Sequence, residues 1–126
     1  MVRTSAILSA ILLLSVELLH LKMALAATFT VGDAAGWTFN MEAWPRGKRF
    51  NAGDKLVFNY HPNMHNVMAV DENGYASCTI SPPNAPKYTS GHDEIELKAG
   101  SNYFICGIPG HCQHGMKIAV VARQIE

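Results

Sequence analysis

One stretch of eleven residues, from Cys106 to Met116, gathers side chains that can hold a metal ion. Four residues separate Cys106 from His111, and four more separate His111 from Met116. A thiolate, an imidazole and a thioether form a soft donor set, which suits copper in both its Cu(I) and Cu(II) states. Taken singly, a Met beside a strand is more often core filling, and an exported Cys is more often half of a disulfide. The regular spacing of all three between two predicted strands favours a metal site.

A second imidazole would complete a trigonal copper site with a weak axial Met. His65 can supply it, because the sequence Met-His-Asn-Val around it stands at the start of an earlier predicted strand. We therefore predict one copper ion held by His65, Cys106, His111 and Met116. We also expect Asn66 to hold the surrounding loops by hydrogen bonds, as residues behind metal ligands commonly do.

The chain has three cysteines, so one disulfide leaves one thiol over. If Cys106 binds metal, Cys78 pairs with Cys112, and the bridge lies just behind His111. The two other pairings would consume the Cys106 thiolate and fit only a protein that binds no copper. At this point the pairing depends on the metal prediction.

Zinc and enzymatic chemistry are the competing interpretations of these residues. Zinc prefers four firm N, S or O ligands, and a thioether is a poor fourth. A catalytic zinc also needs a general base, but residues 106–116 contain no Glu or Asp. The chain has neither a His-Glu-x-x-His nor a Gly-x-Ser-x-Gly motif, so we predict that it is not an enzyme.

Other His and Met residues could in principle bind metal as well. His61, Met64 and Met68 could form a Cu(I)-loading patch, but we expect the two methionines to pack as apolar residues beside a strand. His114, inside the metal loop, could compete as a ligand, but we expect it to lie on the surface. We expect the two tryptophans, Trp37 and Trp44, to anchor the core or a loop.

The elements that must position these residues are short strands. No segment has a sustained helical period, whereas runs rich in Val, Ile, Phe and Tyr recur between Gly, Pro and Asn turn signals, of which Asn73-Gly74 is one. Polar and apolar residues alternate from Asp93 to Leu97, which predicts a strand with one solvent-exposed face. Ser81–Tyr88 holds three prolines and predicts a loop. Short helices are weakly indicated near Asp33–Gly36 and Tyr75–Cys78. The predicted strands are Thr28–Val31, Lys55–Tyr60, Asn66–Val70, Glu94–Leu97, Asn102–Cys106 and Lys117–Ala122.

The N-terminal segment is predicted to be a secretory signal peptide over residues 1–26. Arg3 precedes an apolar run too short to span a bilayer, and Ala24-Leu25-Ala26 is a small-x-small cleavage signal. Cleavage after Ala27 is the alternative. The remaining domain, 27–126, has 8 Lys and Arg against 9 Asp and Glu, which is unlike a basic nucleic-acid binder. No apolar tail follows, so we expect neither a stable membrane anchor nor a GPI signal.

The mature chain resembles the plantacyanins, the small blue-copper branch of the plant phytocyanins. The resemblance rests on stretches spread over residues 28–122, namely Phe29-Thr30-Val31-Gly32-Asp33, Gly36-Trp37-Thr38-Phe39, Phe50-Asn51-Ala52-Gly53-Asp54, Met64-His65-Asn66-Val67, Tyr103-Phe104-Ile105-Cys106, Pro109-Gly110-His111-Cys112 and Met116-Lys117-Ile118-Ala119-Val120. Stellacyanins carry Gln where this chain has Met116, and uclacyanins usually add a Ser/Pro-rich extension that it lacks. Some plantacyanins are strongly basic, which this chain is not.

The resemblance implies an all-β cupredoxin fold, a Greek-key sandwich of two sheets with one or two short helices. It implies one type 1 copper on His65, Cys106, His111 and Met116, and a disulfide from Cys78 to Cys112. It further implies a secreted protein of the apoplast or cell wall, with some relatives linked to reproduction.

We expect a monomeric one-electron carrier with an unidentified redox partner or extracellular receptor. His111 would be the electron outlet, because uncharged Ile108-Pro109-Gly110 precedes it. The alternative is an extracellular signalling or matrix-binding module in which copper is mainly structural.

Overall fold

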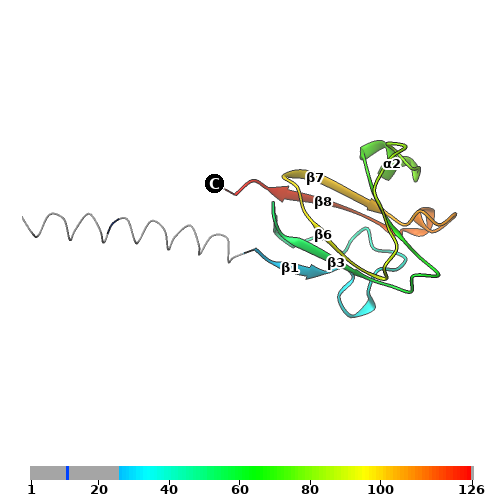
Figure 1. Cartoon of the computed structure of the whole chain (residues 1–126), viewed down its shortest axis with the longest axis horizontal. Coiled ribbons are helices and arrows are strands. Elements are labelled where there is room, and N and C mark those ends of the chain that lie inside the picture. The colour runs from blue at the N-terminus through cyan, green and yellow to red at the C-terminus, as the bar shows by residue number, and fades with distance from the viewer. Residues whose placement is uncertain (1–10, 12–25, 126) are drawn as a thin grey trace, which may run out of the picture.

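A computed structural model describes residue 11 and residues 26–125. The predicted signal peptide lies almost wholly outside these described residues. The chain forms two facing sheets (Figure 1), and the first has the strand order β1-β3-β6. Its strands are β1 (Thr28–Thr30), β3 (Lys55–Asn59) and β6 (His92–Glu96). The second sheet has the order β2-β8-β7-β4-β5, with strands β2 (Phe50–Asn51), β8 (Lys117–Arg123), β7 (Gly100–Ile105), β4 (Val67–Val70) and β5 (Lys87–Tyr88).

The predicted all-β sandwich is therefore confirmed, and both sheets are mixed. Strand β1 runs parallel to β3 and β2 runs parallel to β8, while the other pairings are antiparallel. The main core lies between the sheets and includes Leu56, Phe58, Phe104, Ile118 and Val120. Burial of such apolar side chains is the main force that holds two sheets face to face.

Strand β6 shows the alternation that the sequence predicts. Asp93 and Ile95 are buried, whereas His92, Glu94 and Glu96 are exposed. The strand lies at an edge of the first sheet, and its exposed residues project from the face opposite to that of the buried Asp93 and Ile95.

Strand β4 is apolar throughout because both of its faces are covered. Val67 faces the core between the sheets, whereas Met68 and Val70 belong to a second apolar cluster. The helix α2 (Glu72–Ser77) supplies Tyr75 to this second cluster, and it lies on the outer side of the five-stranded sheet (Figure 1). A strand buried on both faces has no polar alternation to preserve.

Three local predictions differ from the structure. Asn73-Gly74 was expected to be a turn, but it lies inside α2, whose first turn is capped by the Asp71 carboxylate accepting from the Gly74 N–H at 2.9 Å. Ser81–Tyr88 was expected to be a loop, but it ends in β5. The short strand β2 was not predicted. The weakly indicated first helix is a single 3-10 turn, η1 (Asp33–Ala35).

None of the helices in the described part of the chain is long and apolar enough to cross a membrane.

Candidate metal centre

Three of the four predicted ligands lie next to the ends of strands, and the fourth, His111, lies in the loop between β7 and β8. Cys106 directly follows β7 and Met116 directly precedes β8, while His111 stands just before the 3-10 helix η2 (Cys112–His114). Because β7 and β8 are antiparallel neighbours, the two ends of the loop meet, and the Cys106 N–H donates to the Met116 carbonyl at 3.0 Å. His65 approaches from two residues before β4, the other neighbour of β7.

The structure brings His65, Cys106 and His111 together. Their donor atoms all lie within 4.8 Å of one another. The two Nδ1 atoms of His65 and His111 are 3.0 Å apart, and the Cys106 Sγ lies 3.6 Å from the Nδ1 of His111. The two imidazoles thus turn their Nδ1 atoms toward each other beside the thiol sulfur, so the three side chains can share one ion.

Burial separates these donors into an inner group and an outer residue. Cys106 is 1% exposed and His65 is 9% exposed, whereas His111 is only half-buried. Burial lowers the pKa of His65, and the nearby His111 and His61 lower it further. A neutral imidazole keeps a free lone pair, which is the form that binds a metal ion.

Met116 belongs to the same buried cluster as Cys106, with no exposed surface. Its N–H donates to the His111 carbonyl at 3.2 Å, so the backbone ties it to the imidazole-bearing turn. Two imidazoles, one unpaired thiol and a buried thioether, with no carboxylate in the cluster, fit a soft metal such as copper better than zinc.

Asn66 fastens the two ligand-bearing segments to each other. Its Oδ1 accepts from the Gly107 N–H at 2.6 Å, and its backbone carbonyl accepts from the buried Trp37 indole at 3.0 Å. A Cβ on Gly107 would lie 2.9 Å from the Met68 side chain, so the loop after Cys106 passes very close to β4. The expected bonding role of Asn66 therefore has a specific partner in this loop.

The disulfide joins Cys78 to Cys112, as the metal interpretation required, and Cys106 remains unpaired. Cys78 caps the C-terminus of α2, and Cys112 begins η2 directly after His111. The bridge therefore connects the helix on the outer face of the sheet to the loop that carries the ligands.

Phe39 is the residue near the site that sequence reasoning missed. Its ring centroid lies 5.6 Å from that of His65 and 5.0 Å from that of His111, and both contacts are edge-on. The next residues are attached to the metal loop, because the Asn40 N–H donates to the His114 carbonyl at 3.3 Å and Met41 donates to Gly115 at 2.8 Å. An aromatic residue far upstream in the sequence carries no local signal of this contact.

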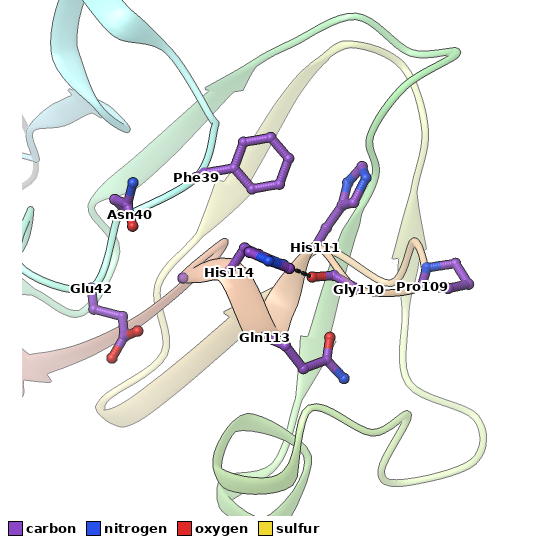
Figure 2. A pocket seen from close by; sticks show the side chains of 9 residues that line it. Phe39, Asn40, Glu42, Pro109, Gly110, His111, Gln113 and His114 are labelled. Atoms are coloured by element: carbon purple, nitrogen blue, oxygen red, sulfur yellow. Dashed lines mark hydrogen bonds between the residues drawn. The ribbon is translucent and has the colours of Figure 1, made fainter.

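A shallow pocket of about 690 Å³ lies beside His111 (Figure 2). Phe39 and His111 form part of its wall, and His114 bonds through its Nδ1 to the Gly110 carbonyl at 2.7 Å. Pro109 lies at the rim, exposed to solvent. One imidazole of the cluster is thus reachable from outside, next to aromatic and uncharged groups and one carboxylate, that of Glu42.

The other candidate metal residues lie outside the donor cluster. His61 and His114 are exposed, as expected for surface residues. Met68 packs in the second cluster, but the packing expected of Met64 is wrong, because its side chain is 58% exposed. Trp37 is buried in the main core and Trp44 packs against its margin, as predicted.

Known proteins are similar to this chain in fold and in sequence. Residues 37–116 match the family described as the plastocyanin-like domain. The basic blue protein of Cucumis sativus is 58% identical over 96 residues, which cover 76% of this chain and 99% of that protein. The solved cucumber basic protein, a blue copper protein, superimposes with a TM-score of 0.74 at 58% identity, covering 75% of this chain and 98% of that one. Spinach plantacyanin does so with a TM-score of 0.65 at 56% identity, covering 70% and 94%. This chain therefore belongs to the plastocyanin-like family of blue copper proteins, whose cofactor is copper, and its resemblance to the plantacyanins is confirmed.

Proposed function

We propose that this protein is a secreted one-electron carrier and not an enzyme, with its copper held by His65, Cys106, His111 and Met116. The observation that supports this most directly is the convergence of two imidazoles and the unpaired Cys106 thiol within 4.8 Å, beside a buried Met. Secretion rests on the small-x-small signal before residue 27 and agrees with the disulfide. The partner and any role in the cell wall or in reproduction follow only from family membership.

The chain's own residues hold the donors in place before and after an electron moves. Copper supplies cycling between Cu(I) and Cu(II). The backbone bonds from Cys106 to Met116 and from Met116 to His111 fix the loop, and Asn66 clamps it to β4. A site whose donors cannot move far needs little rearrangement when its charge changes.

His111 is the proposed outlet for the electron. It is half-buried, whereas the other three proposed ligands are at most 9% exposed. Phe39 and Pro109 make the surface around it mainly uncharged, and Glu42 is the acidic residue among those that line the pocket. Ile108 was also predicted from the sequence to belong to this uncharged surface, but its side chain packs against the core. A small, mostly uncharged surface suits brief docking of a redox partner.

Visible spectroscopy of the purified mature protein tests the ligand set. Addition of Cu(II) should produce an intense thiolate-to-copper band, and Cys106→Ser should abolish it because the thiolate is its source. His114→Ala is the matched control, since this exposed histidine lies in the same loop outside the donor cluster. A folded native protein that stays colourless with copper would contradict the proposal.

The outlet is tested with Pro109→Glu, which places a charge beside His111. Electron self-exchange should slow at least about tenfold, because two negative surfaces must meet and be desolvated. Val121→Glu is the control, since Val121 is 66% exposed and lies five residues along the chain from Met116. Unchanged self-exchange in Pro109→Glu would refute the His111 outlet.

The signalling alternative is tested with Cys106→Ser. If the folded variant still binds its extracellular receptor or the cell wall as the native protein does, this result would favour the signalling alternative.

A further inference from the structure

Asp54 is a buried carboxylate without a cationic partner. It is 1% exposed and stands between β2 and β3. Its Oδ2 accepts from the Asn51 N–H at 2.8 Å, and its Oδ1 accepts from the Ala27 N–H at 2.9 Å. No ion pair to Asp54 is found among residues 26–125. A buried charge that only amide groups compensate is costly, and such charges are normally paired.

The atom that faces this carboxylate is the one that signal-peptide cleavage would change. Cleavage after Ala26 converts the Ala27 backbone N–H into a free amino group, which is protonated at neutral pH and offers three N–H donors. The Ala27 carbonyl is fixed independently, because it accepts from the Lys55 N–H at 2.9 Å, and β1 begins at the next residue. The new ammonium would therefore stay beside Asp54.

We propose that the signal peptide is cut after Ala26 and that the new ammonium of Ala27 forms a buried ion pair with Asp54. Removal of the leader then completes the fold, because it supplies the cation that Asp54 lacks. Cleavage one residue later would delete the nitrogen that Asp54 contacts. Cleavage one residue earlier would move the positive charge away by up to about 3.8 Å, the spacing of adjacent Cα atoms. A shift of the cleavage site by one residue in either direction would thus remove the ion pair.

The ion pair and the copper site involve different residues, so either proposal can be wrong while the other holds. Asp54 lies outside the donor cluster of His65, Cys106 and His111. Copper binding is read from the visible band, while the ion pair is read from unfolding of metal-free protein. A variant can therefore lose one property and keep the other.

The test compares three forms of the domain in guanidinium unfolding. They begin at Ala27, at Ala26, or at an N-acetylated Ala27, and the free forms are released from a fusion by a protease that leaves no added residues. The form that begins with a free Ala27 should have an unfolding equilibrium constant at least about tenfold smaller than the other two. In Asp54→Asn this difference should disappear, because the amide keeps an acceptor but loses the charge.

Asp93→Asn is the matched control, since Asp93 is also a buried carboxylate but lies in β6. Its three forms should keep the full difference. If Asp54→Asn does not fold, the three native-sequence forms still decide the question. When the full chain is expressed in a plant host, the intact mass of the secreted protein should correspond to a chain that begins at Ala27. Equal stability of the three forms, the same difference in Asp54→Asn, or a first residue of Thr28 would each overturn the proposal.

Discussion

Met116 has no exposed surface, so its thioether lies in a dry part of the core next to Cys106. Gln is the closest replacement in length, but its amide oxygen is a harder donor that favours Cu(II). We expect Met116→Gln to keep the visible band and to lower the reduction potential. Voltammetry measures this directly. An unchanged or raised potential would count against Met116 as the axial ligand.

Tyr60 gives the protein a specific dependence on alkaline pH. Its hydroxyl donates to the buried Asp93 carboxylate, and the Tyr88 carbonyl oxygen, 3.1 Å from the hydroxyl oxygen, is a second acceptor for the same proton. Burial raises the pKa of Tyr60 above its usual value, and the bond to Asp93 raises it further. The folded state therefore keeps this proton at pH values where the unfolded state has lost it. The stabilisation is complete below about pH 10 and declines as the pH rises further.

Tyr60→Phe removes this proton together with its hydrogen bond to a charged group. It should cost about 1–3 kcal/mol of unfolding free energy at pH 7, because Asp93 loses a donor. The decline of stability above pH 10 should become shallower, although Tyr75, whose pKa burial also raises, retains part of it. Urea unfolding at pH 7 and pH 11 tests both points. An equally steep decline in the variant would assign the alkaline sensitivity elsewhere.

Among the elements, α2 depends on contacts that the local sequence conceals. Asn73-Gly74 is a strong turn signal, yet a Cβ on Gly74 would lie 2.8 Å from both the Thr79 carbonyl oxygen and the Val70 side chain. The glycine is needed because the helix passes so close to β4 and to the segment after it. The sequence shows the glycine but not the neighbour that requires it.

The disulfide connects α2 to the metal loop across a sequence separation of 34 residues. Closing a loop of this length contributes about 4 kcal/mol in the chain-entropy description. Replacing Cys78 and Cys112 together by Ser should remove a large part of this stability and weaken copper retention, since η2 adjoins His111. Unfolding midpoints and the rate of copper loss to a chelator provide the measurements. Copper loss at the native rate in a destabilised variant would show that the bridge serves the fold alone.

The strands with strong side-chain patterns were predictable, and those defined by pairing were not. Six runs of β-branched and aromatic residues correspond to β1, β3, β4, β6, β7 and β8. The strands β2 and β5 have two residues each and exist because β8 and β4 offer them a partner. Likewise, the regular spacing of Cys106, His111 and Met116 could be recognised from the sequence because all three lie in one loop. The approach of Phe39 was not, because it depends on how the segment before β2 folds back.

At the scale of the whole molecule, the core and the disulfide are formed by groups other than the metal. Copper removal should therefore leave a cooperatively folded protein. Because copper binds the folded state, its removal should lower the Tm by roughly 10–20 °C when free copper is about 100-fold above its Kd. Calorimetry with and without copper, with Cys106→Ser as the metal-free reference, measures the difference. Loss of cooperative unfolding without copper would show that the metal organises the fold.

Strand β6 is an edge strand of the first sheet, and this position bears on how these molecules behave when crowded. An unpaired strand edge can recruit another strand and seed aggregates. Here the residues along that edge with exposed side chains are His92, Glu94 and Glu96. Two such edges would bring four carboxylates face to face, and their repulsion opposes sheet extension from one molecule to the next. This charge pattern is a built-in barrier to polymerisation, and it would keep the protein dispersed at high local concentration.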